Sequence, residues 1–185
     1  MADVFLLTGG PGSGKTTIFK EAIAHAGIRA GGFYTGEIRA AGVRKGFKIN
    51  TLDGRECILA HVDFTSPHRV GKYGVDITGL ESTGISALIN AADICDCIVV
   101  DEIGRMELFS QKFKEIVWQI LQCPKKVLGT VMAKPHPFAD EIKRLPGVRL
   151  AVVNPRNRPI IRNQVIEWLM VPINEDNDHA HGTGG

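Results

Sequence analysis

The sequence predicts an α/β protein in which a mainly parallel sheet carries helices on both faces and an antiparallel hairpin insertion. Two observations predict this fold class. Short apolar runs alternate with segments of helical period, which is the pattern of parallel strands joined by helices. Residues 31–79, in contrast, show apolar and polar residues in alternation, broken by turn residues, as antiparallel hairpins do.

The first elements are a buried strand at 3–8 and a helix at 15–26. The strand is expected because VFLL is continuously apolar, and the helix because apolar residues then recur every three or four positions. Further along, FYTGEIR, VRKGFKINTL and ECILA are separated by AAG and DG, so hairpin strands are expected over 32–59, with another short strand near 70–77.

The second half returns to alternating helices and strands. The buried positions of the last helix are expected to be Ile161, Val165, Trp168 and Leu169, which share one helical face. The remaining expected elements are a helix at about 80–92, a strand at 97–101, a helix over 113–121, a strand at 126–130, a helix near 138–145 and a strand at 149–153.

The length and composition fit one globular domain. With 185 residues, of which 44% are hydrophobic, the chain can bury a core of its own. We expect this domain to cover 1–172. The remaining segment, 173–185, is polar and ends in glycines, so it is predicted to be a disordered tail whose His179 and His181 are solvated rather than metal ligands.

Charge and cysteine content narrow the class of partner. The net charge of +2, from 22 basic and 20 acidic residues, gives no field that indicates nucleic acid or an anionic membrane. The N-terminal apolar run is too short for a signal peptide or a membrane span, so a cytoplasmic location is expected. The cysteines lack paired CxxC spacing and are predicted to be core thiols: Cys57, Cys95, Cys97 and Cys123.

A glycine-rich segment, GGPGSGKTT, lies between the first strand and the first helix. It fits the pattern GxxxxGK[ST] in the structural context that this pattern requires. Backbone N–H groups at a helix N-terminus bind phosphate well only if no side chains intervene, which explains the glycines. A glycine-rich turn with a lysine by chance satisfies the same letters, but not the context. The predicted nucleotide-binding residues are Gly9, Gly10, Pro11, Gly12, Ser13, Gly14, Lys15, Thr16 and Thr17.

Three of these residues have specific predicted roles. Lys15 is expected to reach the β- and γ-phosphates, and the Thr16 hydroxyl to bind Mg²⁺. Thr17 is expected to hold the α-phosphate through its backbone N–H.

A second informative segment is CIVVDEIGRMELF, in which an apolar strand ends in two carboxylates. Asp101 is predicted to bind the Mg²⁺, with an acidic helix cap as the alternative. Glu102 is predicted to polarise a water for attack on the γ-phosphate, with a surface ion pair to Arg105 as the alternative. Glu107 is interpreted as a solvated residue or one in the first turn of a helix.

Basic and amide side chains complete the predicted site. Arg105 is the first candidate to offset negative charge in the transition state, and Arg69 is the second. Asn154, Asn157 and Arg158 are expected to contact the base, because amides and a planar guanidinium suit that task. A capping role at the last helix is the alternative for Asn157.

Together, the segments GGPGSGKTT, GGFYTGEIR, RVGKYGVD, VVDEIGRMELFS, LGTV and NPRNR resemble a family of P-loop nucleoside triphosphatases. This family includes the human cancer-related nucleoside triphosphatase and its archaeal and thermophilic bacterial relatives. The resemblance covers the chain to about residue 170. It implies a RecA-like core, with the phosphate loop at Gly9 to Thr17, the metal-binding aspartate at Asp101, the water-activating glutamate at Glu102 and a basic residue at Arg105.

The predicted function is therefore Mg²⁺-dependent hydrolysis of ATP, GTP, CTP and UTP to diphosphate and phosphate, with broad base specificity. A nucleotide or small-molecule kinase is one alternative, although the sequence has no arginine-rich lid pattern and a glutamate after the metal-binding aspartate favours water as the nucleophile. A nucleotide-dependent switch activated by a partner is the other.

Overall fold

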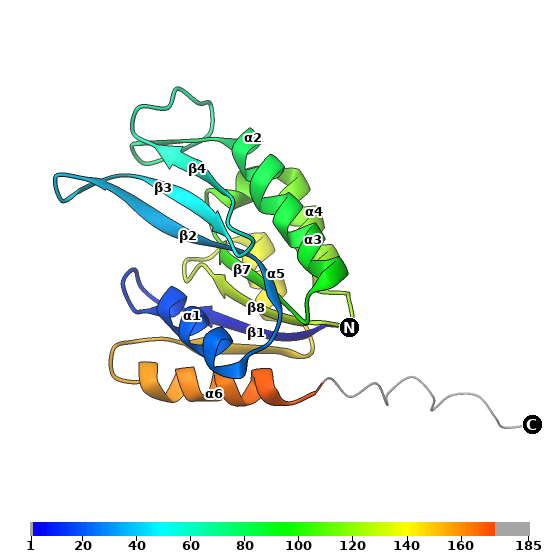
Figure 1. Ribbon diagram of the computed structural model, residues 1–185. Coiled ribbons are helices and arrows are strands. Elements are labelled where there is room, and N and C mark those ends of the chain that lie inside the picture. Colours follow the sequence, from blue (N-terminus) through cyan, green and yellow to red (C-terminus); the bar gives the residue numbers. More distant parts are fainter. Residues whose placement is uncertain (1, 173–185) are drawn as a thin grey trace, which may run out of the picture.

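The computed structural model describes residues 2–172, which form one nine-stranded sheet with helices on both faces (Figure 1). The strand order is β5-β6-β4-β3-β2-β7-β8-β1-β9. The strands from β2 to β9 in this order pair in parallel, and β3, β4, β6 and β5 extend the sheet in antiparallel fashion. The predicted α/β class, with helices on both faces of the sheet, is confirmed.

The strands are β1 (Asp3–Thr8), β2 (Ala30–Ala40), β3 (Val43–Thr51), β4 (Glu56–His61), β5 (Arg69–Val70), β6 (Tyr73–Val75), β7 (Cys97–Ile103), β8 (Lys126–Val131) and β9 (Val148–Val152). The helices are α1 (Lys15–Ala26), α2 (Ile77–Gly79), the π-helix η1 (Leu80–Ile85), α3 (Ser86–Ile94), the 3-10 helix η2 (Glu107–Phe109), α4 (Gln111–Ile120), α5 (Pro137–Lys143) and α6 (Arg158–Met170).

Alternating side chains of the central strands fill two cores. In β1, Val4 and Leu6 point to the core under α3, α4 and α5, whereas Phe5 and Leu7 point to the core under α1 and α6. This alternation follows from the two-residue period of a strand. The predicted inner face of α6 is buried, through Ile161, Val165, Trp168 and Leu169. On the predicted inner face of α1, Ile18, Phe19 and Ala22 are buried, whereas Ile23 and Ala26 are half-buried.

The hairpin is continuous with the parallel sheet. Ala30 to Tyr34, the first half of β2, pairs in parallel with β7, and the second half continues beyond it with β3 (Figure 1). Gly32 allows this arrangement, because it has a φ of 107° and a Cβ there would overlap the Val99 carbonyl oxygen. β2 therefore joins the antiparallel hairpin to the parallel part of the sheet, next to β7.

The predicted helix at 80–92 is longer and less regular than expected. Helical backbone runs from Ile77 to Ile94 through α2, η1 and α3, with six π-helical residues from Leu80 to Ile85. The Asp76 side chain caps its start by accepting a hydrogen bond of 3.0 Å from the Gly79 N–H.

No helix within residues 2–172 has the length and hydrophobicity needed to cross a bilayer.

The prediction that the cysteines are core thiols is confirmed for two of the four. Cys95 and Cys97 are buried, Cys57 and Cys123 are half-buried, and all four are free thiols. The predicted tail at 173–185, with His179 and His181, lies outside the described residues.

Candidate functional site

The glycine-rich loop follows β1 and leads into α1. Gly9 has a φ of 147°, and a Cβ there would overlap the Val153 carbonyl oxygen. Gly14, the N-cap of α1, has a φ of 95°. Both conformations are difficult for residues other than glycine. The loop thus presents backbone at the positive end of a helix, as phosphate binding requires.

Lys15 spans this loop. Its Nζ donates hydrogen bonds to the Gly9 and Gly10 carbonyl oxygens, at 3.0 and 3.1 Å. The ammonium group therefore lies over the concave side of the loop, where a bound phosphate would place negative charge.

The first turn of α1 is joined to the carboxyl ends of β7 and β8 through one carboxylate. Asp101 Oδ2 accepts a hydrogen bond of 2.6 Å from Thr16 Oγ1, and Asp101 Oδ1 accepts one of 2.5 Å from Thr130 Oγ1. Thr130 is not among the site residues predicted from the sequence. The sequence does carry one indication of this residue, because a threonine lies close to the end of the apolar strand KVLGTV. The carboxyl ends of parallel strands meet at one edge of the sheet, where ligands bind.

The environment of Asp101 suits a hard cation. The side chain is buried, and burial raises its pKa, while the hydroxyls of Thr130 and Thr16 and the Lys15 charge oppose that shift. A nearby divalent cation would stabilise the ionised form. The carboxylate of Asp101 and the hydroxyl of Thr16 are the oxygen ligands that Mg²⁺ prefers when phosphate and water supply the rest, so these residues fit the ion.

Glu102 is half-buried next to this carboxylate. Burial raises its pKa, the Asp101 charge raises it further, and Lys15 lowers it. The two adjacent acids therefore occupy different environments: Asp101 faces the hydroxyls of α1 and β8, whereas no hydroxyl of the described residues donates to Glu102.

Glu107 differs from its sequence interpretation as a solvated residue. It does lie in the first turn of a helix, η2, but its side chain is only 4% exposed. Burial raises the pKa of Glu107 to about 8, helped by the charges of Glu102 and Asp101 and opposed by the backbone amides of Glu107 and Gly104. A lone glutamate in RMELF gives no sequence signal of burial beyond its apolar neighbours.

The two arginine candidates lie in different settings. Arg105 is exposed on the turn after β7, and no hydrogen bond or ion pair within residues 2–172 involves its guanidinium. Arg69 donates to the Phe64 and Lys72 carbonyl oxygens, at 3.1 and 2.8 Å, and so holds the β5–β6 turn. Of the two, Arg105 is therefore the one whose donors are not engaged within the described residues.

The loop from Val153 to Arg158 uses its asparagines internally. Asn154 Oδ1 accepts from the Arg156 and Asn157 N–H groups, at 2.9 and 3.1 Å. Asn157 accepts from Asn154 N–H and donates to the Val152 carbonyl oxygen, both at 2.8 Å. These bonds shape the start of α6, in line with the capping alternative, and base contact by the two asparagines stays a prediction.

Arg158 packs against the glycine-rich loop. Its Cδ is 2.5 Å and its Nη1 3.1 Å from the point where a Cβ of Gly14 would lie. The end of the arginine stem and its guanidinium therefore both pack over Gly14, the N-cap of α1.

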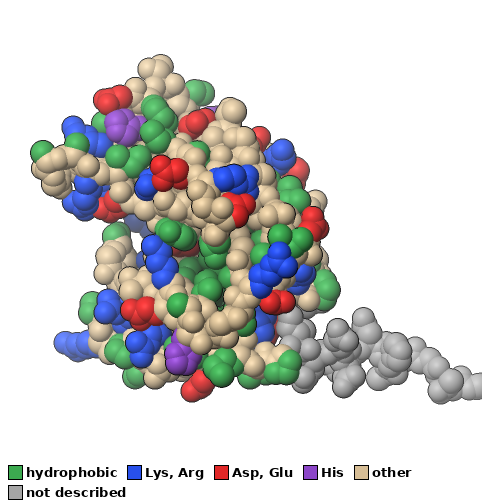
Figure 2. Space-filling model, in the orientation of Figure 1, with side chains coloured by type: hydrophobic (Ala, Val, Ile, Leu, Met, Phe, Trp, Pro, Cys, Tyr) green, Lys and Arg blue, Asp and Glu red, His purple; other side chains and the backbone are tan. Residues whose placement is uncertain are grey.

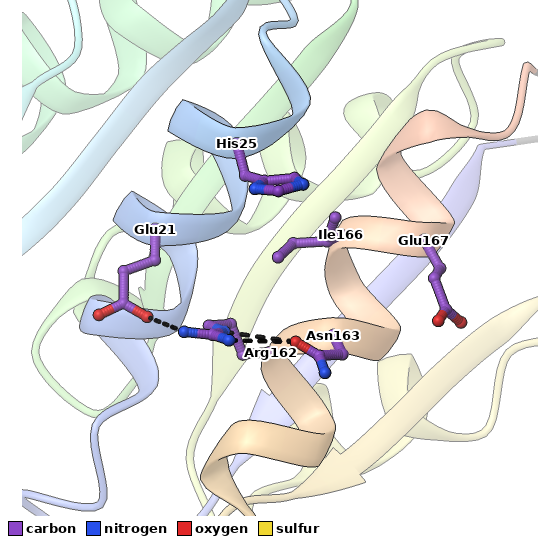
Figure 3. A pocket seen from close by; sticks show the side chains of 6 residues that line it. All are labelled: Glu21, His25, Arg162, Asn163, Ile166 and Glu167. Atoms are coloured by element: carbon purple, nitrogen blue, oxygen red, sulfur yellow. Dashed lines mark hydrogen bonds and ion pairs between the residues drawn. The ribbon is translucent and has the colours of Figure 1, made fainter.

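Two hollows of the surface differ in character. Figure 2 shows an indentation between the projecting hairpin and the lower half of the molecule, with Lys and Arg side chains on both sides of it. A separate groove of about 320 Å³ lies between α1 and α6, where Arg162 contacts Glu21 at 3.4 Å and His25 faces Ile166 (Figure 3). None of the predicted site residues lines the groove.

Comparison with known proteins places this geometry in a family. The NTPase family profile matches residues 4–166. The nucleoside-triphosphatase THEP1 of Thermotoga petrophila is 44% identical over 173 residues, covering 94% of this chain and 96% of the relative. That of Aquifex aeolicus is 40% identical over 173 residues, covering 89% and 97%.

Solved structures agree with the sequence matches. The crystal structure of THEP1 from Aquifex aeolicus has a TM-score of 0.83 at 39% identity, and covers 90% of this chain and 98% of that chain. The solution structure of a human cancer-related nucleoside triphosphatase has a TM-score of 0.77 at 36% identity, and covers 91% and 97%. The resemblance drawn from the motifs is thereby confirmed, and the chain belongs to the NTPase family.

Proposed function

We propose that this nucleoside-triphosphatase hydrolyses ATP, GTP, CTP and UTP to the diphosphate and phosphate, with Mg²⁺ as its cofactor and little preference for the base. The observation that carries the proposal is the convergence on Asp101 of hydroxyls from α1 and β8, beside the phosphate loop and next to Glu102. The groups proposed to bind phosphate, bind the metal and orient water thus lie close together.

Binding of the triphosphate falls to the loop and Lys15. The backbone N–H groups at the start of α1 and the Lys15 ammonium supply positive potential for the β- and γ-phosphates. Thr16 and Asp101 would hold Mg²⁺, which when bound neutralises negative charge on the phosphates. In this proposal Arg105 adds positive charge from the turn after β7, and Arg158 contacts the base.

Glu102 supports hydrolysis by water over transfer of the phosphoryl group to an alcohol. In-line attack on the γ-phosphate needs little beyond positioning and charge stabilisation, so a carboxylate that orients water is enough to select the nucleophile. Glu102 is half-buried and lies near Lys15, which keeps it close to the phosphate-binding groups.

Broad base specificity is expected because few side chains of the loop before α6 are free to distinguish one base from another. Both asparagines of the loop before α6 are hydrogen-bonded to its backbone. A guanidinium that stacks on a ring accepts any base. We therefore expect similar turnover of all four nucleotides.

The test is phosphate release from each nucleotide, with Mg²⁺ or with EDTA and with no acceptor added. We expect release from all four with Mg²⁺, none with EDTA, and none from Lys15→Ala. Tight nucleotide binding without release would contradict hydrolysis and favour the kinase or the partner-activated switch. Release from only one nucleotide would contradict the broad specificity.

A further inference from the structure

Glu107 is a buried acid, and its carboxyl group has no role in the reaction proposed above. It lies at the start of η2, on the turn that follows Glu102 and β7. Burying an acid is costly unless its surroundings use it or it stays protonated. With a pKa of about 8, Glu107 is mostly protonated at neutral pH and so has an O–H group to donate.

The carboxyl groups of Glu107 and Glu102 both lie next to Gly104. A Cβ built on Gly104 would lie 3.0 Å from Glu107 Oε2 and 3.2 Å from Glu102 Cδ. Gly104 is itself buried. Both acids thus border the small space that the missing side chain leaves, and a larger residue there would displace at least one of them.

The turn that carries Glu107 is held firmly in place. Leu108 N–H donates to the Gly104 carbonyl oxygen and Ser110 N–H donates to that of Glu107, both at 3.0 Å. Ser110 Oγ accepts from the Phe113 N–H at 3.0 Å and donates to Glu81 Oε1 at 2.6 Å, which ties the turn to α4 and η1. The backbone of Glu107 is therefore fixed relative to β7.

We propose that Glu107 is a positioning residue: its carboxyl O–H donates to the Glu102 carboxylate through one water and holds it in the orientation that activates water. This inference rests on the proposed hydrolysis and adds a residue to it. Glu107 acts through Glu102 and does not touch the nucleotide. Its contribution should appear in turnover and leave nucleotide affinity unchanged.

The test compares two substitutions that differ in their ability to donate. Glu107→Gln keeps a donor, and we expect its kcat to stay within about threefold of the wild type. Glu107→Met keeps the size but has no donor, and we expect kcat to fall about 10- to 100-fold, as misplacement of a reacting group does. The Kd of a non-hydrolysable ATP analogue should change by less than about twofold in both. Glu115→Met, an exposed position on α4, is the matched control.

A double-mutant cycle separates positioning from general damage. In the Glu102→Gln background, Glu107→Met should cause no further loss of kcat, because its target is already gone. Gly104→Ala keeps both carboxyl groups but intrudes between them, and it should lower kcat with the analogue still bound, which covers the case in which Glu107→Met does not fold.

Three results would overturn the inference: wild-type kcat in Glu107→Met, equal losses in Glu107→Gln and Glu107→Met, or losses that multiply in the cycle. A wild-type enzyme that releases no phosphate would instead refute the proposed hydrolysis itself. The two failures are therefore distinguishable.

Discussion

Thr16 Oγ1 donates a hydrogen bond of 2.6 Å to Asp101 Oδ2, although β8 lies between the strands that lead into these two residues. The bond connects the phosphate loop with the carboxylate that follows the apolar core of β7. Two segments that are 85 residues apart in sequence are thereby set at hydrogen-bond distance.

Removing either partner should abolish Mg²⁺-dependent turnover. For Thr16→Val and Asp101→Asn we expect kcat/KM to fall by about 100-fold or more, because the Mg²⁺ that would offset charge on the triphosphate then loses a protein ligand. Thr16→Ser, which keeps the hydroxyl, should stay within about tenfold. Steady-state phosphate release measures all three. Full activity in Thr16→Val would refute a role for its hydroxyl.

Asp101→Asn should separate activity from stability. Burial raises the pKa of Asp101, so its ionised form destabilises the folded state at neutral pH. In EDTA, therefore, the neutral variant should unfold at a Tm no lower than that of the wild type. A clearly lower Tm would mean that the hydrogen bonds of the carboxylate outweigh the cost of its burial.

The two adjacent glycines of the loop should differ in their tolerance of alanine. Gly9→Ala meets the Val153 carbonyl oxygen at a φ of 147°, so we expect a loss of about 1–3 kcal/mol in the free energy of unfolding. Apart from the chain neighbours of Gly10, no heavy atom of residues 2–172 lies within 4 Å of a Cβ built there, so Gly10→Ala should leave that free energy within about 0.5 kcal/mol. Urea unfolding compares them, and equal values would contradict the geometry of the loop.

Glu107 should make stability depend on pH in a defined direction. Its pKa is about 8 when folded and near 4.5 when unfolded. Below the unfolded value both states are protonated and there is no cost; as pH rises towards 8, only the unfolded state ionises. The wild type should therefore lose a few kcal/mol relative to Glu107→Gln between pH 5 and 8. Urea unfolding at both pH values measures this, and a constant difference would show that Glu107 ionises normally.

Arg158 should affect affinity more than chemistry. Its side chain packs over Gly14, the N-cap of α1. For Arg158→Ala we expect KM to rise about fivefold for all four nucleotides with kcat unchanged, as loss of about 1 kcal/mol of stacking predicts. Arg156→Ala, an exposed neighbour, is the control. A rise for one base only would instead indicate specific recognition.

Local patterns were sufficient to predict that a glycine-rich loop joins the first strand to the first helix, and the order of most elements. The glycines, Lys15 and Thr16 follow one another in sequence, and their chemistry requires that spacing. The apolar periods of α1 and α6 likewise report which faces are buried, because a helix repeats every 3.6 residues.

Features that depend on distant packing were not predictable in this way. The burial of Glu107 and the hydrogen bond from Thr130 to Asp101 arise from strands and turns that meet only in the fold. Similarly, β2 was assigned to a hairpin by its alternation, but its first half also pairs with β7. Strand partners are not encoded in the periodicity of one strand.

The most direct test of the account is to measure nucleotide affinity and single-turnover hydrolysis for the wild type and for Glu102→Gln in parallel. Orientation of water by Glu102 predicts that the variant binds a non-hydrolysable ATP analogue with an unchanged Kd, while its rate of hydrolysis with Mg²⁺ falls by about 100-fold or more. A variant that hydrolyses ATP at the wild-type rate, or that loses affinity to the same extent as turnover, would contradict this role of Glu102.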